Sequence, residues 1–196
     1  MKKLVVVMGI FLGLSAQFVM AKPVTYKVSA KDSQLKWTGK KVTGQHHGYV
    51  KVKDGHLKVE GKQIVGGEFT IDMTSITVED IEEEKWNKKL NGHLRSDDFF
   101  HVNKHKTAKL EIKDAQFGKG GKHNVFADLT IKGKTRPVQF DVKLDDKGEK
   151  VVGKSKITFD RTNYDIKYRS GSFFDSLGDK MIYDDVEIDV KLVAKK

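Results

Sequence analysis

No cysteine occurs among the 196 residues of the chain. Without cysteine the chain forms no disulfide, so an exported protein of this composition must rely on its own apolar core. Seven histidines remain as candidate metal ligands. His101 and His105 would share one face of a strand and His46 adjoins His47, but no Cys or carboxylate falls at a repeated ligand spacing. We therefore expect no metal site, and histidines at the rim of the fold instead.

Two catalytic signatures are also missing. The Gly-x-Ser-x-Gly motif of a nucleophile elbow does not occur. Residues 133–135, Gly-Lys-Thr, match the end of a phosphate-binding loop, but the loop would need a glycine where the chain has Asp128. We predict a hairpin turn at residues 133–135, and we expect no cofactor.

The N-terminus carries an apolar run, LVVVMGIFLGLSAQFV, after the basic start MKK. Val19 and Ala21 occupy the −3 and −1 positions of a cleavage site, which predicts a secretory signal peptide over residues 1–21. Polar and glycine residues interrupt the run, so we expect no stable membrane anchor. Lys22 follows the predicted cut in place of the cysteine of a lipoprotein. Residues 22–196 are expected to form one domain, exported to the periplasm or secreted.

Basic residues outnumber acidic ones. Of 37 Lys and Arg, 35 remain after the loss of Lys2 and Lys3, against 27 Asp and Glu, which gives a net charge of +8. Such an excess favours anionic partners, including lipid head groups and nucleic acid. Because an exported protein does not normally meet nucleic acid, we expect no nucleic-acid partner.

Most of the remaining chain alternates apolar and polar residues with a period of two, which is typical of strands that have one buried face. The clearest run is VEIDVKL, residues 186–192, and VQFDVKL, residues 138–144, repeats it. Three further runs bury Phe69, Ile71 and Met73; Ala108, Leu110 and Ile112; and Ile157 and Phe159. Turn signals rich in Gly and Asp fall at residues 53–55, 66–67, 118–121, 132–134 and 145–148. The pattern predicts a long antiparallel meander.

One segment, EDIEEEKWNKKLNGHL at residues 79–94, breaks the alternation and predicts a short helix. Trp86, Leu90 and Leu94 form its apolar stripe, and Gly92 is expected to end it. A single helix cannot cover the apolar faces of about eight strands. The predicted fold class is therefore all-β: an antiparallel β-barrel of about eight strands with one short capping helix.

The segment HLRSDDFF, residues 93–100, gathers several polar side chains after this helix. Ser96 is expected to cap a new short turn, with the two aspartates near its positive end. Adjacent carboxylates on a turn diverge, which argues against a general acid/base pair. The two phenylalanines of the segment are expected to plug the end of the barrel.

The inward face of the barrel allows two interpretations. A barrel of about eight strands encloses an interior just wide enough for side chains alone or for one apolar ligand. The same apolar residues serve both arrangements. The pattern does not choose between a filled core and a lined pocket.

Five strings, in this order, resemble the YceI family of periplasmic, lipocalin-like proteins. They are WTGKKVTG (37–44), GGEFTIDMTSI (66–76), GHLRSDDFFHVNKHKTAKLEI (92–112), LTIKGKTRPVQFDV (129–142) and FDRTNYDI (159–166). The resemblance covers essentially all of residues 24–192. It implies a lipocalin-like barrel that holds a polyisoprenoid or similar long-chain amphiphile, for transport or storage and without catalysis.

If the resemblance holds, the tube supplies the affinity. Burial of a CH₂ contributes ~0.8 kcal/mol, so ten methylenes supply roughly 8 kcal/mol before ordering costs, against about 0 to 1 kcal/mol for an exposed ion pair. The predicted lining consists of Trp37, Phe69, Ile71, Met73, Leu110, Ile112, Phe126, Leu129, Ile131, Phe140, Val142, Ile157 and Phe159. Phe173 and Phe174 are expected in a mobile lid. A polar head group would be held by Arg161, Tyr164, Tyr168 and Arg169.

Two alternatives stay open. The first is a hydrolase that uses His93, Asp97 and Asp98, although no residue spacing indicates an activity. The second is a barrel with a filled core that acts through its surface, on a protein partner or as a homodimer. An unpaired strand edge would favour the homodimer.

Overall fold

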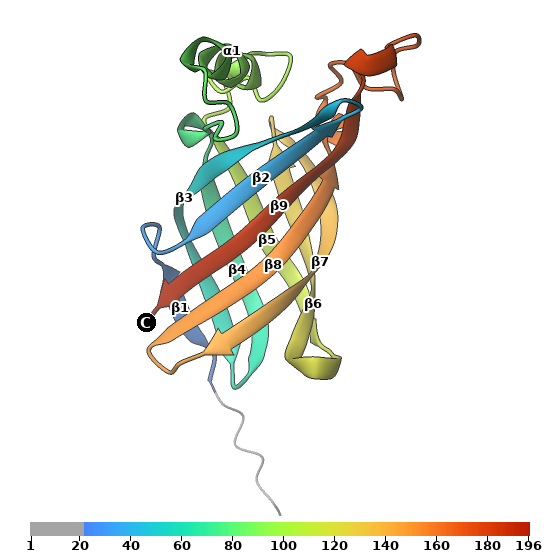
Figure 1. Ribbon diagram of the computed structural model, residues 1–196. Coiled ribbons are helices and arrows are strands. Elements are labelled where there is room, and N and C mark those ends of the chain that lie inside the picture. Colours follow the sequence, from blue (N-terminus) through green and yellow to red (C-terminus); the bar gives the residue numbers. More distant parts are fainter. Residues whose placement is uncertain (1–21) are drawn as a thin grey trace, which may run out of the picture.

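The computed structural model describes residues 22–196, so the predicted signal peptide, residues 1–21, lies outside the described residues. The strands are β1 (Val24–Val28), β2 (Gln34–Lys41), β3 (Gly44–Glu60), β4 (Gln63–Asp72), β5 (Thr107–Phe117), β6 (Lys122–Ile131), β7 (Lys134–Asp146), β8 (Lys150–Asp160) and β9 (Ile182–Lys195). The helix α1 spans Glu84–Arg95. Short 3-10 turns are η1 (Met73–Ser75), η2 (Lys119–Gly121), η3 (Arg161–Tyr164) and η4 (Gly178–Lys180). Figure 1 shows a barrel with α1 at one end.

Strands β2 to β9 form a closed antiparallel ring of eight. Each strand from β3 to β8 pairs with the next one along the chain, and β9 closes the ring on β2, which pairs with β3. The short β1 continues the position of β2 between β3 and β9, where it pairs with residues 56–59 of β3 and 194–195 of β9. The predicted barrel of about eight strands with one helix is confirmed.

The ring closes because the apolar faces of its strands have few other partners. Successive side chains of a strand point to opposite faces, and β6 alternates accordingly, with Val125, Ala127, Leu129 and Ile131 buried and their neighbours half-exposed. Other strands repeat this pattern, so a single core lies inside the ring. Among residues 22–196, no helix is long and apolar enough to cross a membrane.

Two of the predicted turns are wrong. Residues 53–55 lie inside β3, where the register with β4 shifts between Val52 and Asp54, and residues 66–67 lie inside β4. A β-bulge uses the same residues as a tight turn, glycine above all, so the sequence signal is the same. The other three signals do fall at connections between strands.

The helix differs from its prediction at both ends. It begins at Glu84, several residues after the predicted start, and it continues through Gly92 to Arg95. Ser96 closes it, because the Ser96 hydroxyl donates to the carbonyl oxygen of His93 at 2.8 Å. Leu94 is buried, but Trp86 is 47% exposed and does not belong to a packed apolar stripe.

The segment that leads from β4 to α1 is fastened along the start of β3. The Thr77 N–H donates to the Tyr49 carbonyl at 2.9 Å, and the Glu79 N–H donates to the His47 carbonyl at 2.9 Å. Trp37 Nε1 also donates to the Thr77 carbonyl at 2.9 Å. Gly48 makes this approach possible, because a Cβ there would lie 1.9 Å from the Thr77 oxygen.

We expect Gly48→Ala to destabilise the fold, because the added methyl group pushes the Thr77 carbonyl off β3 and breaks its bond to Trp37. Overpacking of this kind costs about 1–3 kcal/mol, and for a chain of this size each kcal/mol lowers Tm by about 2–4 °C. Gly39→Ala on β2 is the control, since its Cβ would meet nothing closer than 3.9 Å. Equal melting temperatures for the two variants would contradict the account.

Candidate functional site

The interior of the barrel is hollow. Two cavities of about 150 Å³ and about 90 Å³ follow one another along the barrel. They share the side chains of Leu35, Ile71, Leu110 and Ile157, so these four residues lie between the two cavities as a waist. The two cavities with this waist are called the tube below. Of the two interpretations of the sequence, a lined pocket describes the interior better than a filled core.

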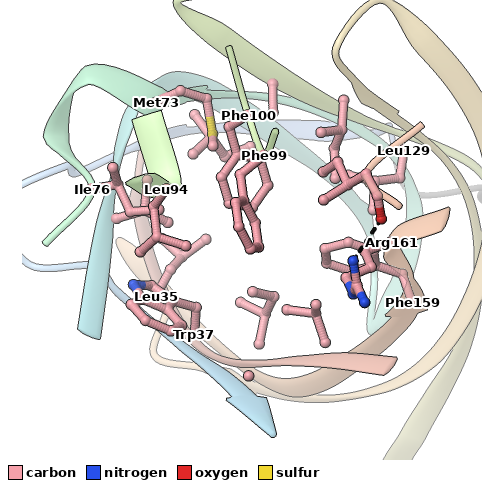
Figure 2. Close-up of a pocket in the computed structure, with 18 of the residues that line it drawn as sticks. Leu35, Trp37, Met73, Ile76, Leu94, Phe99, Phe100, Leu129, Phe159 and Arg161 are labelled. Carbon is pink, nitrogen blue, oxygen red and sulfur yellow. Dashed lines mark hydrogen bonds between the residues drawn. The ribbon is translucent and has the colours of Figure 1, made fainter. Parts of the chain in front are cut away.

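The larger cavity lies at the end of the barrel that carries α1. Leu94 reaches it from the helix, and Phe99 and Phe100 reach it from the turn that follows. Figure 2 shows the two phenylalanine rings extending into the cavity, opposite Phe159 and Arg161. The prediction that these two residues plug one end of the barrel is confirmed.

The smaller cavity lies in the other half of the barrel, and its lining is apolar apart from Ser155. Its large side chains include Phe69 on β4 and Phe140 on β7. Small residues at inward-facing positions leave this space open: Gly153 in the smaller cavity, and Gly39 and Ala108 in the larger one. A core of close-packed density would have larger side chains at such positions.

Arg161 carries the one charge in the lining of either cavity. Its side chain is 2% exposed and is held by three backbone carbonyls. Nε donates to Tyr183 at 3.1 Å, Nη1 to Ile166 at 2.7 Å and Nη2 to Ile182 at 3.0 Å. Nη2 also donates to Asp184 Oδ1 at 3.1 Å. A guanidinium has five N–H groups, so one N–H of Nη1 has no partner among the described residues.

Burial lowers the pKa of Arg161, and the nearby carboxylate of Asp184 opposes that shift. An arginine nevertheless keeps its charge in a protein. Asp184 is held in turn by the hydroxyls of Ser170 and Ser172, at 2.9 Å and 2.7 Å from Oδ2. The segment between β8 and β9 is therefore folded around a fixed guanidinium at the edge of the tube.

The other three residues predicted to hold a head group do not line the tube. Tyr164 is 1% exposed with no partner for its hydroxyl in the part of the chain described, and burial raises its pKa to about 12. Tyr168 packs its ring against His93, at a centroid distance of 4.6 Å. Arg169 is exposed and lies over the ring of Tyr168. The structure brings only Arg161 to the cavity.

Most of the predicted lining does face the tube. The residues placed there are Trp37, Phe69, Ile71, Met73, Leu110, Ile112, Leu129, Ile131, Phe140, Val142, Ile157 and Phe159. Phe126 lies outside both cavities, because Val125 and Ala127 take the inward positions of β6. Phe173 and Phe174 also lie outside them, each 50% exposed. Their role in a mobile lid stays a prediction.

Three residues of β3 also line the tube and were not predicted to do so. Val50 and Val52 line the tube before the bulge, and Leu57 lines it after the bulge, with the inward positions moved by one residue. The alternation GYVKV at residues 48–52 signals the first pair. The interpretation of residues 53–55 as a turn hid the second part of the strand.

The residues of the hydrolase hypothesis are partly assembled. His93 Nε2 lies 3.0 Å from Asp98 Oδ2, and the His93 ring packs against Phe99 and Tyr168. The nearby hydroxyl, Ser96, donates to the backbone of His93 and not to its ring. Within residues 22–196, His, Asp and Glu side chains do not gather in threes as metal ligands. The contacts of His93 hold the turn that carries Phe99 against the helix.

An antiparallel eight-stranded barrel around an apolar tube, with a helix over one end, is a lipocalin-like architecture. The model of the YceI-like domain matches residues 26–194. The chain belongs to the YceI-like family, as its sequence motifs predict.

Comparison with individual proteins gives the same fold. A UPF0312 protein of Photorhabdus laumondii is 30% identical over 127 residues, which cover 65% of this chain and 62% of that protein. The match thus spans less than two thirds of that relative. BcnA of Burkholderia cenocepacia superimposes with a TM-score of 0.70 at 22% identity, over 86% of this chain and 99% of that one. A polyisoprenoid binding domain from Saccharophagus degradans gives a TM-score of 0.63 at 15% identity, over 87% and 97% of the two chains.

Hydrogen bonds to Asp80 join the β2–β3 hairpin to the segment that leads into α1. His46 Nδ1 lies 2.7 Å from Asp80 Oδ2, and the backbone N–H of His47 donates to Asp80 Oδ1 at 2.8 Å. Burial alone would raise the pKa of Asp80, but the contacts with His47 and His46, together with a hydrogen bond from its own backbone, more than offset it, so the pKa lies below its ordinary value of 3.8. The carboxylate therefore fastens the helical end of the tube while it is charged.

A carboxyl group whose pKa is lowered by folding stabilises the fold at pH values above its ordinary pKa. This contribution is lost as the pH falls through the lowered pKa. We therefore expect the wild-type chain to lose stability below about pH 4, with a shallower loss in Asp80→Asn. Urea unfolding at neutral pH and at pH near 3 measures the difference. Asp175→Asn, which removes an exposed carboxylate, should retain the wild-type slope. Parallel pH profiles for wild type and Asp80→Asn would rule out this role.

Proposed function

We propose that the chain binds a long-chain apolar or amphiphilic molecule, such as a polyisoprenoid, inside the tube. The observation that carries this proposal is the pair of adjoining cavities, lined by aliphatic and aromatic side chains with Arg161 as the one charge. An apolar cavity of this size excludes water and accepts apolar molecules. The shape favours a single extended chain over a compact ligand.

Cavities inside a folded protein cost stability unless a ligand fills them. Residual cavities destabilise by about 24 cal/mol per Å³. Volumes of about 150 Å³ and 90 Å³ thus correspond to about 4 and about 2 kcal/mol. A chain that fills the tube restores the missing contacts, at ~0.8 kcal/mol for each buried methylene. The strongest binding is expected for chains long enough to pass the waist.

Arg161 gives the tube a direction. Its guanidinium lies at the helical end of the barrel, near Phe159 (Figure 2). Four of its N–H groups hold the guanidinium in place, so no side-chain entropy is lost when a ligand oxygen accepts the fifth. We infer that the carbonyl, hydroxyl or phosphate oxygen of an amphiphile sits at Arg161 and that its tail runs through the waist.

The similarity to a polyisoprenoid binding domain from Saccharophagus degradans supports the same ligand class. We further propose transport or storage in place of catalysis, since the His93 and Asp98 pair is occupied in holding Phe99. Export is part of the proposal, with residues 1–21 as the cleaved signal peptide. An exported carrier of this kind would exchange its cargo with lipid in the periplasm or outside the cell.

Ile157→Trp tests the proposal at the waist, because the indole fills the passage between the two cavities. Native mass spectrometry would follow the uptake of polyprenols of increasing length. We expect at least a tenfold loss of long-chain binding, since about 1.4 kcal/mol, the value of about two methylenes, already gives that factor. Short chains that fit into the larger cavity should still bind.

The matched control is Thr158→Trp, the same substitution at the next residue of β8, on the outward face. It should bind long chains as the wild type does. Leu110→Phe at the opposite side of the waist provides a second, milder block. Unchanged long-chain uptake by folded Ile157→Trp and Leu110→Phe proteins would exclude the tube as the binding site.

A further inference from the structure

Trp86, Phe173 and Phe174 are among the large aromatic side chains exposed at the helical end of the barrel. Trp86 on α1 is 47% exposed, and Phe173 and Phe174 in the segment between β8 and β9 are 50% exposed. Isolated exposed apolar residues are ordinary on a protein surface. These three are distinguished by their place and by the charges beside them.

Two of the rings have lysine ammonium groups over them. Lys85 and Lys89 place Nζ at 5.5 Å and 5.0 Å from the centroid of Trp86. Lys167 places Nζ at 4.8 Å from the centroid of Phe173 and also pairs with Asp165 at 3.0 Å. In residues 22–196, the helix pairs Glu84 with Lys88, and neither Lys85 nor Lys89 takes part in an ion pair. Two uncompensated cations therefore flank an exposed indole.

The aromatic residues flank the larger cavity. Leu94 of α1 lines it on one side. Ile166 lines it from the segment that carries Phe173 and Phe174, and Ile182 and Tyr183 line it from the start of β9, which follows that segment. At the same end, the N–H of Val42 in the β2–β3 turn donates to the Met181 carbonyl of this segment at 3.2 Å. Figure 1 shows α1 and the segment before β9 projecting beyond the strands at one end of the barrel.

We propose that this end of the barrel docks onto an anionic lipid bilayer, with Trp86, Phe173 and Phe174 entering the interface. The inference rests on the proposed lipid-binding function and names the surface with which the cargo is exchanged. Tryptophan and lysine are the residues that anchor proteins at the membrane–water boundary. Each lysine near an anionic leaflet adds attraction that salt screens.

The composition of the surface favours lipid over a protein partner. Protein interfaces are enriched in aromatic residues and Arg but depleted in Lys, whereas lysines accompany the aromatic residues here. Glu82 and Glu83, which precede the helix, reduce the attraction to an anionic surface. Docking should therefore be reversible, as a carrier requires, and should need both the aromatic residues and the charge.

The test uses residues 22–196, which contain every strand of the described barrel, so that the apolar run at residues 4–19 does not itself bind lipid. Co-sedimentation is measured with vesicles of phosphatidylcholine alone and with added phosphatidylglycerol. We expect binding to the anionic vesicles that salt weakens. The double variant Phe173→Ser with Phe174→Ser, and separately Trp86→Ser, should each bind about tenfold more weakly, a loss of about 1.4 kcal/mol.

Phe117→Ser is the matched control. Phe117 is 54% exposed and ends β5, which starts at the helical end, so it lies at the opposite end of the barrel. This variant should sediment with anionic vesicles as the wild type does. The proposal is overturned if Phe117→Ser loses as much vesicle binding as Trp86→Ser or the Phe173→Ser, Phe174→Ser double variant. It is also overturned if the protein binds neutral and anionic vesicles equally, or if Phe173 and Phe174 control self-association instead of vesicle binding.

The waist variant Ile157→Trp separates this inference from the proposed function. If both hold, Ile157→Trp loses uptake of long chains but still docks on anionic vesicles. Docking without any uptake by the wild type would contradict the proposed function alone. Uptake from detergent without vesicle binding would contradict the docking alone.

Discussion

The closure of the sheet determines the rest of this structure. One helix cannot cover the apolar faces of eight strands, so those faces can only be buried against one another, and the sheet must form a ring. At one point of the ring β1 and β2 share a single strand position between β3 and β9. The interior of an eight-stranded ring is barely wide enough for side chains. Whether it is filled or hollow therefore depends on a few inward-facing residues, such as Gly39, Ala108 and Gly153.

The hollow interior and the buried guanidinium of Arg161 are two features of the barrel that support the proposed binding function and do not add to its stability. Cavities of this volume reduce stability by several kcal/mol, on the order of a third or more of the net stability of a typical domain. Burial of Arg161 adds a further cost, which its three carbonyls and Asp184 offset. Arg161 borders the larger cavity, so the proposed ligand, an apolar chain with a polar end, would contact both features at once.

The barrel could be predicted from the sequence because apolar and polar residues alternate along most of its strands. Strict alternation identifies the inward face of β9 and most of the tube lining without knowledge of the partner strands. Prediction failed where one residue type serves two structures: the glycines of residues 53–55 and 66–67 read as turns but lie within strands. Phe126 was assigned by its apolar character, although its position in the alternation of β6 points it outward.

The residues that hold a polar head group were harder to predict, because closeness within the segment RTNYDIKYR does not show which way each side chain points. Tyr164 is buried behind the tube and Tyr168 supports His93, because the chain folds back around Arg161 through contacts with Ile182, Tyr183 and Asp184 that lie far along the sequence. The exposure of Trp86 was not predicted either. This residue has the spacing of a packed helix residue but lies exposed beside two lysines.

The central claim is that the tube carries a long-chain molecule. The most direct measurement is organic extraction of the protein purified natively from its own host, followed by mass spectrometry of the extract. The account predicts a stoichiometric isoprenoid or other long-chain amphiphile with an oxygen-bearing end that can accept from Arg161. An empty extract, repeated after incubation of the protein with lipids of the host, would contradict it.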